Sequence, residues 1–207
     1  MFTGLVEAAG EVVRFDESQD GFQLDVEMPE SISDWALGDS IAVNGCCLTV
    51  ARSENRLVSF DLLAETVKRT SFAQLQSGQR VNLERSLLPT SRMGGHFVSG
   101  HIDEAGVIDK FEPRGSDFYL AVSCSHPSTR YLIEKGSITV DGISLTVAEV
   151  LDDGFAVWLI PHTRNQTNLR FRVSGDRVNL EFDLLAKHVE RMLQVREESF
   201  SDRKVHP

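Results

Sequence analysis

The chain has 207 residues and a formal net charge of −10, with an isoelectric point near 5.0. This acidity disfavours nucleic acid as the main partner, because phosphate binding relies on lysine and arginine, and it disfavours docking on an anionic membrane. We also expect neither a secretion signal nor a membrane span, since the N-terminus lacks a basic region followed by an apolar one and no apolar run approaches roughly 18 residues.

Short strands fill the first half of the chain. Apolar residues alternate or run together over a few positions and stop at glycine, aspartate or asparagine, a pattern typical of β-strands. The segments that show it most clearly are 22–28, 40–43, 57–62 and 80–83. Asn44-Gly45 lies between two apolar runs, and this pair favours a tight hairpin because both central residues of a type I′ turn need a positive φ.

The second half of the chain repeats the first. Residues 138–147 (ITVDGISLTV) match 41–50 (IAVNGCCLTV) at six of ten positions, 97 residues later. Residues 175–184 match 78–87 at seven of ten positions with the same offset, which indicates two copies of one domain. The strand segments of the second copy are 118–122, 137–140, 155–159 and 177–180. About six short strands per copy predict a small antiparallel β-barrel for each.

Between and after the two copies the composition changes. Residues 88–95 are rich in turn residues and read as a linker, which places one barrel in 1–95 and the other in 96–184. The segment 185–207 has helical spacing, with Asp183 as a candidate cap. Its apolar stripe either packs back on its own barrel or docks against other subunits. The residues of that stripe are Leu185, Val189, Met192, Leu193 and Arg196, with Lys187, Glu190 and Arg191 on the other face.

The cysteines and histidines form neither a disulfide framework nor a metal-site pattern. Cys46, Cys47 and Cys124 are too few and too irregularly placed for paired disulfides. Neither an HExxH nor a CxxC motif occurs. We therefore expect a protein of the reduced cytoplasm that holds no metal.

The motifs of both copies resemble those of the riboflavin synthase α-chain family. They are MFTGLVE at the start, NGCCLTV, GGHFVSGHID at the junction, KGSITVDGISLTV, LIPHT and GDRVNLEFD, and the resemblance covers roughly residues 1–185. It implies an all-β fold of two tandem six-stranded antiparallel Greek-key barrels plus a C-terminal α-helix. It also implies a homotrimer held by that helix, and association with lumazine synthase is a further expectation.

The resemblance implies a reaction as well. Two molecules of 6,7-dimethyl-8-ribityllumazine exchange a four-carbon unit, and the products are riboflavin and 5-amino-6-ribitylaminouracil. The donor and the acceptor are the same molecule, which gives the duplication a chemical meaning, and no cofactor is expected. In this family the site lies between the N-terminal barrel of one subunit and the C-terminal barrel of a neighbour.

Two other functions are open to such a chain. A non-catalytic lumazine or flavin carrier of the same family would have lost polar residues from one copy, whereas here both copies keep them. A flavin-dependent reductase with a related barrel would carry an R-x-Y-[ST] motif, which Arg130-Tyr131-Leu132 does not match.

Three side chains are candidate catalytic groups. Cys47 and Ser144 follow the two hairpin turns at equivalent positions, where a thiol or hydroxyl can bond a pteridine edge or help a nucleophile add to the ring. His101 stands where the first copy has Leu5, and a histidine that titrates near neutrality suits removal of a proton from the acidic C7 methyl group. In the alternative interpretation, Cys47 and Ser144 are small polar residues that fill a tight barrel end. His101 would then be a surface residue, or a histidine whose hydrogen bonds are satisfied in the core. His96 is a weaker candidate because it lies in the linker.

The candidate substrate-binding residues come from the segments that match the family's ligand-contacting motifs. They are Phe2, Thr3, Gly4, Val6, Thr49, Ala64, Glu65, Thr66, Gly100, Ile102, Lys135, Thr146, Ile160, His162, Thr163 and Asp183. Strand alternation places Cys47 with Thr49 on one face and turns Cys46 toward the core. Plain core packing for Phe2, a solvated charge for Lys135 and a helix cap for Asp183 are the alternatives.

Overall fold

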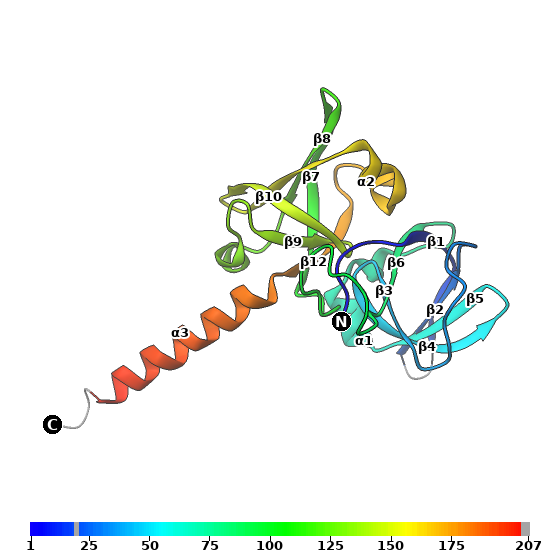
Figure 1. Cartoon of the computed structure of the whole chain (residues 1–207), viewed down its shortest axis with the longest axis horizontal. Helices are drawn as coiled ribbons and strands as arrows, with labels where there is room; N and C mark the ends of the chain where they lie inside the picture. The colour runs from blue at the N-terminus through cyan, green and yellow to red at the C-terminus, as the bar shows by residue number, and fades with distance from the viewer. Residues whose placement is uncertain (19–20, 204–207) are drawn as a thin grey trace.

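The duplicated sequence folds as two closed antiparallel β-barrels with one long helix at the end of the chain (Figure 1). The computed structural model describes residues 1–18 and 21–203, with side chains to residue 196. The strands of the first barrel follow one another around the ring as β1-β2-β5-β4-β3-β6, which is a Greek-key connectivity. Its elements are β1 Ala8–Ser18, β2 Gly21–Glu27, β3 Ser40–Val43, β4 Cys46–Glu54, β5 Leu57–Leu62, α1 Ala64–Arg69, the 3-10 helix η1 Ser71–Gln74 and β6 Arg80–Arg85.

The second barrel has the same connectivity, with β10-β11-β8-β7-β12-β9 as the order around its ring. Its elements are β7 Glu104–Arg114, β8 Asp117–Ser123, η2 His126–Tyr131, β9 Ser137–Val140, β10 Ile143–Leu151, β11 Gly154–Leu159, α2 Pro161–Gln166, η3 Asn168–Phe171 and β12 Arg177–Phe182. The prediction of two tandem six-stranded Greek-key barrels is confirmed. Every predicted strand lies within an observed one or ends one residue beyond it.

Each barrel encloses its own hydrophobic core, because alternate strand residues point inward. In β4 the side chains of Cys46, Leu48 and Val50 are buried in the core of the first barrel, so the inward orientation predicted for Cys46 is confirmed. Phe60 and Phe155 are fully buried in the first and second cores. Burial of a side chain of that size contributes about 1.5–3 kcal/mol to folding.

The two predicted hairpin turns meet where the barrels touch. Asn44 and Gly45 have φ values of 43° and 78°, and Asp141 and Gly142 have 46° and 78°, as type I′ turns require. A Cβ atom on Gly45 would lie 2.7 Å from the backbone nitrogen of Gly142, and one on Gly142 would lie 2.7 Å from that of Gly45. Glycine is therefore needed at both turns for their close approach as well as for their backbone conformation.

Two asparagines of the repeated VNLE motif join the barrels. Asn82 in β6 donates through its side chain to the carbonyl of Asp141, at 2.9 Å, and Asn179 in β12 donates to the carbonyl of Asn44, also at 2.9 Å. Asn82 also accepts from the backbone N–H of Asn168 at 2.7 Å. Both side chains are buried, so each satisfies backbone groups of the other barrel that water does not reach.

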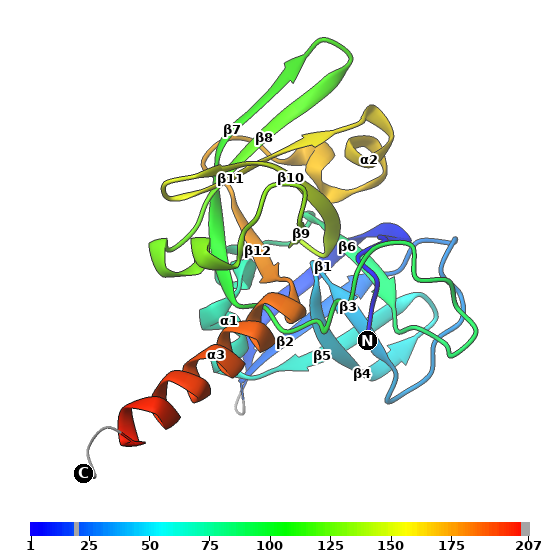
Figure 2. The same cartoon turned by 60° about the vertical axis from the view of Figure 1, so that its left-hand side comes forward.

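The helix α3, Leu184–Arg203, begins directly after the second barrel. The Asp183 carboxylate accepts from the backbone N–H of Leu185 at 2.9 Å, which confirms the predicted cap. One face of the first turns contacts the barrel through Lys187, whose ammonium lies 2.7 Å from the Asp103 carboxylate. Beyond these turns the helix points away from both barrels (Figures 1 and 2).

A second face of α3 is apolar and exposed. Leu185, Val189, Met192 and Leu193 are 60%, 56%, 73% and 53% exposed, so this stripe is not packed against its own barrel. Residues 204–207 of the predicted tail lie outside the described part of the chain. Among the described residues, no helix has the length and apolar character needed to cross a membrane.

The contact between the two turns yields a stability prediction. The Gly45→Ala variant should lose more stability than Gly78→Ala, because both have positive φ (78° and 85°) but only Gly45 has atoms within 4 Å of the added Cβ. The conformational cost, about 1–2 kcal/mol, is common to both variants, and the overlap at the junction adds about 1–3 kcal/mol to the first. Urea unfolding measures the difference, and equal losses would contradict the contact.

Candidate functional site

The candidate residues of β4 and β10 lie on the outer faces of the barrels rather than inside them. Cys47 and Thr49 alternate with the buried residues of β4 and therefore point outward, Cys47 half-buried and Thr49 exposed. Ser144 and Thr146 occupy the same positions in β10, with the same burial. We call the face around Cys47 the first surface and the face around Ser144 the second surface.

A segment of the second repeat lies on the first surface. The backbone N–H of Cys47 donates to the carbonyl of Gly100 at 2.8 Å. Gly100 has φ of 81°, and a Cβ atom there would come within 2.6 Å of the Cys47 Cβ, so glycine is needed for this approach. The contact brings His101, which is exposed, to the first surface, and Ile102 packs against the core of the first barrel.

The N-terminal segment lies on the second surface in the same way. The backbone N–H of Ser144 donates to the carbonyl of Gly4 at 2.8 Å, and a Cβ atom on Gly4 would lie 2.6 Å from the Ser144 Cβ. Leu5 is half-exposed there, and Val6 packs against the core of the second barrel. The two repeats thus exchange their leading segments, so each surface is built from both.

The strand that neighbours β4 or β10 supplies the other edge of each surface. In the first barrel the antiparallel strand β5 ends beside the start of β4, and the chain continues through Leu63 into α1 with Ala64, Glu65 and Thr66 in its first turn. In the second barrel β11 ends beside the start of β10, and the chain continues into α2. That continuation carries the candidates Ile160, His162 and Thr163. Leu63 and Ile160 are 69% and 57% exposed, which gives each surface an apolar side chain free to cover a ring.

The structure joins His96, which the sequence analysis ranked as a weaker candidate, to the candidate catalytic residue Ser144. Its Nδ1 lies 2.8 Å from the Ser144 Oγ, and its backbone N–H donates to the carbonyl of Thr3 at 3.1 Å. Burial lowers the pKa of His96, and the nearby carboxylates of Asp183 and Glu181 oppose that shift. The repeat gave no signal for His96, because the first copy begins after the equivalent position. Leu63, which the sequence analysis did not name, stands 97 positions before the candidate Ile160.

The remaining candidates lie at the edges of these surfaces or beneath them. Phe2 is fully buried and packs with Val98 and Cys47 under the first surface, and Thr3 is buried beside it. Lys135 lies in the turn before β9 with φ of 66°, where its backbone N–H donates to the carbonyl of Val147 at 2.8 Å.

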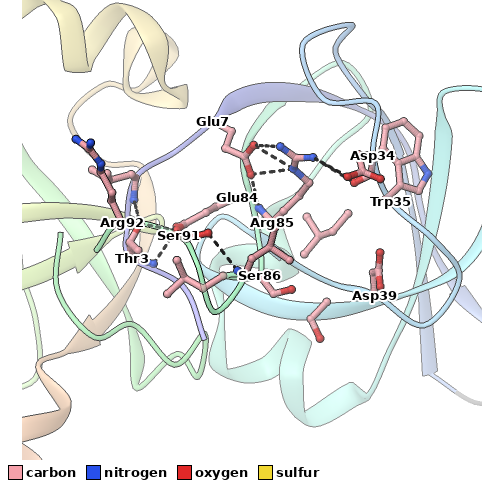
Figure 3. Close-up of a pocket in the computed structure, with 15 residues that line it drawn as sticks. Thr3, Glu7, Asp34, Trp35, Asp39, Glu84, Arg85, Ser86, Ser91 and Arg92 are labelled. Atoms are coloured by element: carbon pink, nitrogen blue, oxygen red, sulfur yellow. Dashed lines mark hydrogen bonds and ion pairs between the residues drawn. The ribbon is translucent and has the colours of Figure 1, made fainter. Parts of the chain in front are cut away.

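Two cavities accompany the barrels but are separate from the candidate catalytic groups. One of about 470 Å³ lies beside the first barrel, along β3 and β6 (Figure 3). Burial opposes ionisation of Glu7 in its wall, but hydrogen bonds and the charge of Arg85, 2.7 Å away, outweigh burial and hold the pKa of Glu7 below its ordinary value. Another of about 670 Å³ lies between α3 and the second barrel. Neither is lined by Cys47, His101 or Ser144.

The two surfaces carry similar polar groups but differ in where a histidine stands, and histidine is the group that can act as a base. Each surface offers a thiol or hydroxyl, a threonine two residues further along the same strand, and an exposed aliphatic side chain. These groups suit a flat heterocycle that has polar edges. His101 stands on the first surface where the second has Leu5, whereas the second has His96 bonded to Ser144. No group of three or more metal-ligating side chains occurs in the part of the chain that the structure describes.

Comparisons with known proteins agree with this architecture. The family model described as "Lumazine binding domain" matches residues 3–86 and 99–183. The riboflavin synthase of Actinobacillus pleuropneumoniae is 42% identical over 193 residues, which cover 93% of this chain and 90% of that protein. The riboflavin synthase of Mycobacterium tuberculosis (strain ATCC 25618 / H37Rv) is 46% identical over 200 residues, which cover 94% of this chain and 98% of that protein.

Solved structures of LumP have the same fold. LumP complexed with riboflavin superposes with a TM-score of 0.80 at 26% identity, covering 88% of this chain and 99% of that one. LumP complexed with 6,7-dimethyl-8-(1'-D-ribityl) lumazine gives 0.77 at 26% identity, covering 87% and 98%.

The buried imidazole yields a titration prediction. The pKa of His96 in the folded protein should lie below the usual value of about 6.5. The unfolded chain then binds the proton first as the pH falls, so His96 should lower the free energy of unfolding between about pH 7 and pH 5. NMR titration of the imidazole, assigned with the His96→Gln variant, measures the pKa. A midpoint at or above about 6.5 would contradict the burial described here, and the variant should lose less stability on acidification than the parent.

Proposed function

The chain belongs to the riboflavin synthase family, and we propose that it converts two molecules of 6,7-dimethyl-8-ribityllumazine into riboflavin and 5-amino-6-ribitylaminouracil. The observation that carries this proposal is the pair of equivalent surfaces, one on each repeat. A reaction between two identical molecules needs two similar binding surfaces that differ in their catalytic groups. The four-carbon unit leaves one lumazine and joins the other, so the equation balances without an oxidant or a reductant.

The groups on the two surfaces suit different halves of the reaction. On the first surface, His101 is placed to take a proton from the C7 methyl group of a lumazine whose edge bonds to Cys47. On the second surface, the Ser144 hydroxyl, bonded to His96 at 2.8 Å, is placed to assist addition of a nucleophile to the other lumazine. General acid–base catalysis of this kind contributes roughly 10²–10⁴-fold, and orientation of two bound rings contributes further.

The remaining candidates suit recognition of the ring and its ribityl chain. Exposed aliphatic side chains at Leu63 and Ile160 cover apolar ring surface. The hydroxyls of Thr49 and Thr66 on the first surface, and of Thr146 and Thr163 on the second, offer the short donors and acceptors that a polyol needs. The sequence candidates Glu65 and His162 extend these two sets from the first turns of α1 and α2.

A non-catalytic carrier is the competing function. The likeness to LumP bound to a lumazine or to riboflavin favours binding in general. The identities of 42% and 46% to riboflavin synthases, against 26% to LumP, favour the enzyme. The presence of polar groups on both surfaces also favours it, because a carrier needs one complete surface.

We further propose a homotrimer in which the apolar stripe of α3 is the contact between subunits. Four large apolar side chains of the stripe are more than half exposed, which is costly for a helix in water. Association would let the first surface of one subunit face the second surface of a neighbour.

The three free cysteines suit a reducing, cytoplasmic location. Association with lumazine synthase stays a prediction.

The activity is tested with purified protein and the lumazine alone. Riboflavin should form at half the molar amount of lumazine consumed, and EDTA should leave the rate unchanged, because both products come from the two substrate molecules. Absorbance and fluorescence of separated products give the ratio. Binding of lumazine without any riboflavin would identify the carrier instead, and a requirement for metal or nicotinamide would overturn the proposed chemistry.

The trimer is tested on α3. Leu193→Glu places a charge within the apolar stripe and should dissociate the trimer, whereas Arg191→Glu places one on another face and should not. Truncation after Asp183 should also give smaller species while both barrels stay folded. Light scattering reports the mass and circular dichroism the fold, and an unchanged trimer in the truncated chain would exclude α3 as the contact.

A further inference from the structure

Two buried glutamates hold the exchanged segments in place. Glu181, at the end of β12, accepts from the backbone N–H of Ser99 at 2.6 Å, from the Ser99 hydroxyl at 2.6 Å and from the backbone N–H of Gly100 at 2.9 Å. Glu84 in β6, at the equivalent position, makes the same three bonds to Thr3 and Gly4 at 2.7, 2.7 and 3.0 Å. Both glutamates belong to the repeated VNLE motif and are buried.

Each glutamate lies in one barrel and acts on the surface of the other. In the segment that Glu181 holds, the Gly100 carbonyl accepts a hydrogen bond from the backbone N–H of Cys47, and His101 is the next residue. The Ser99 hydroxyl, which donates to Glu181, also accepts from the backbone N–H of His101 at 3.3 Å. The backbone of His101 is therefore fixed by a carboxylate that does not itself reach the first surface.

We propose that Glu181 is a positioning residue for the first surface, which sets His101 over Cys47, and that Glu84 does the same for the N-terminal segment over Ser144. The proposal rests on the proposed function for its catalytic consequence, but not for its structural one. A carboxylate is suited to this task because three donors converge on it and it offers acceptors alone. A glutamine in its place would turn an N–H group toward at least one of those donors, and the segment would loosen.

The first test measures the cover over Cys47 without reference to activity. In the intact protein, alkylation of Cys47 by iodoacetamide is followed by peptide mass spectrometry. Burial raises the pKa of Cys46 and of Cys124 to about 12, so these thiols react slowly and serve as internal references. Glu181→Gln should speed labelling of Cys47 about tenfold or more, the scale expected when bonds that close a segment are lost.

Glu84→Gln is the matched control for this measurement. It removes the same charge from the equivalent position but loosens the segment on the second surface, which reaches Cys47 through Phe2 beneath it. Labelling of Cys47 should therefore rise by a smaller factor than in Glu181→Gln. Ser99→Ala is a milder variant that keeps the carboxylate and deletes one of its three bonds, and it should speed labelling by a smaller factor than Glu181→Gln. Unchanged labelling in both Glu181→Gln and Ser99→Ala would overturn the proposal, whether or not the protein forms riboflavin.

The second test asks whether Glu181 acts through His101. His101→Gln should lower kcat roughly 10²-fold with nearly constant KM, as expected for loss of a general base. Glu181→Gln should lower kcat by up to that factor, and the double variant should be no slower than His101→Gln alone. Glu84→Gln combined with His101→Gln should show multiplied losses, because the two changes affect different surfaces. If the losses of kcat in Glu181→Gln and His101→Gln instead multiply in the double variant, Glu181 acts independently of His101, and its positioning role is overturned.

Discussion

The backbone N–H groups at the start of β4 and β10 need acceptors that their own barrels do not provide. On one side, β3 and β9 pair with the first residues of β4 and β10. On the other side, β5 and β11 pair with them only from Val50 and Val147 onward, which leaves the N–H groups of Cys47 and Ser144 without a strand partner there. The carbonyls of Gly100 and Gly4 fill this need at 2.8 Å each. Because each acceptor comes from the other repeat, satisfying these two donors also fixes which segments meet on each surface.

The junction between the barrels follows the same logic of polar satisfaction, with one asymmetry. In the second turn Asp141 is fully buried and lies 3.0 Å from the Arg172 guanidinium, while the first turn has the neutral Asn44. The residue equivalent to Arg172 in the first copy is Leu75, 97 positions earlier. The buried charge of Asp141 thus occurs together with its counter-charge on Arg172, and the first copy has neither. This agrees with the high cost of burying an ion that has no partner.

Local patterns in the sequence predicted the features that depend on local rules. Strand alternation was sufficient to turn Cys46 inward and Cys47 outward, the Asn-Gly and Asp-Gly pairs located both hairpins, and Asp183 was identified as a cap. The exchange of segments was not predictable in this way, because it joins residues far apart in the chain. Neither the backbone bonds to Cys47 and Ser144 nor the contacts of Glu84 and Glu181 follow from a local sequence pattern. For the same reason His96, a linker residue by composition, was separated from Ser144 until the fold brought them together.

The reciprocal exchange of leading segments has the geometry of a domain-swapped homodimer whose two subunits have been joined end to end. In a dimer of identical subunits, any change over one surface would appear over the other as well. Covalent joining removes that symmetry at the level of the gene, so a histidine can stand at His101 while leucine remains at Leu5. The linker therefore allows the two equivalent surfaces to acquire different side chains, while each repeat still supplies the leading segment that lies on the surface of the other.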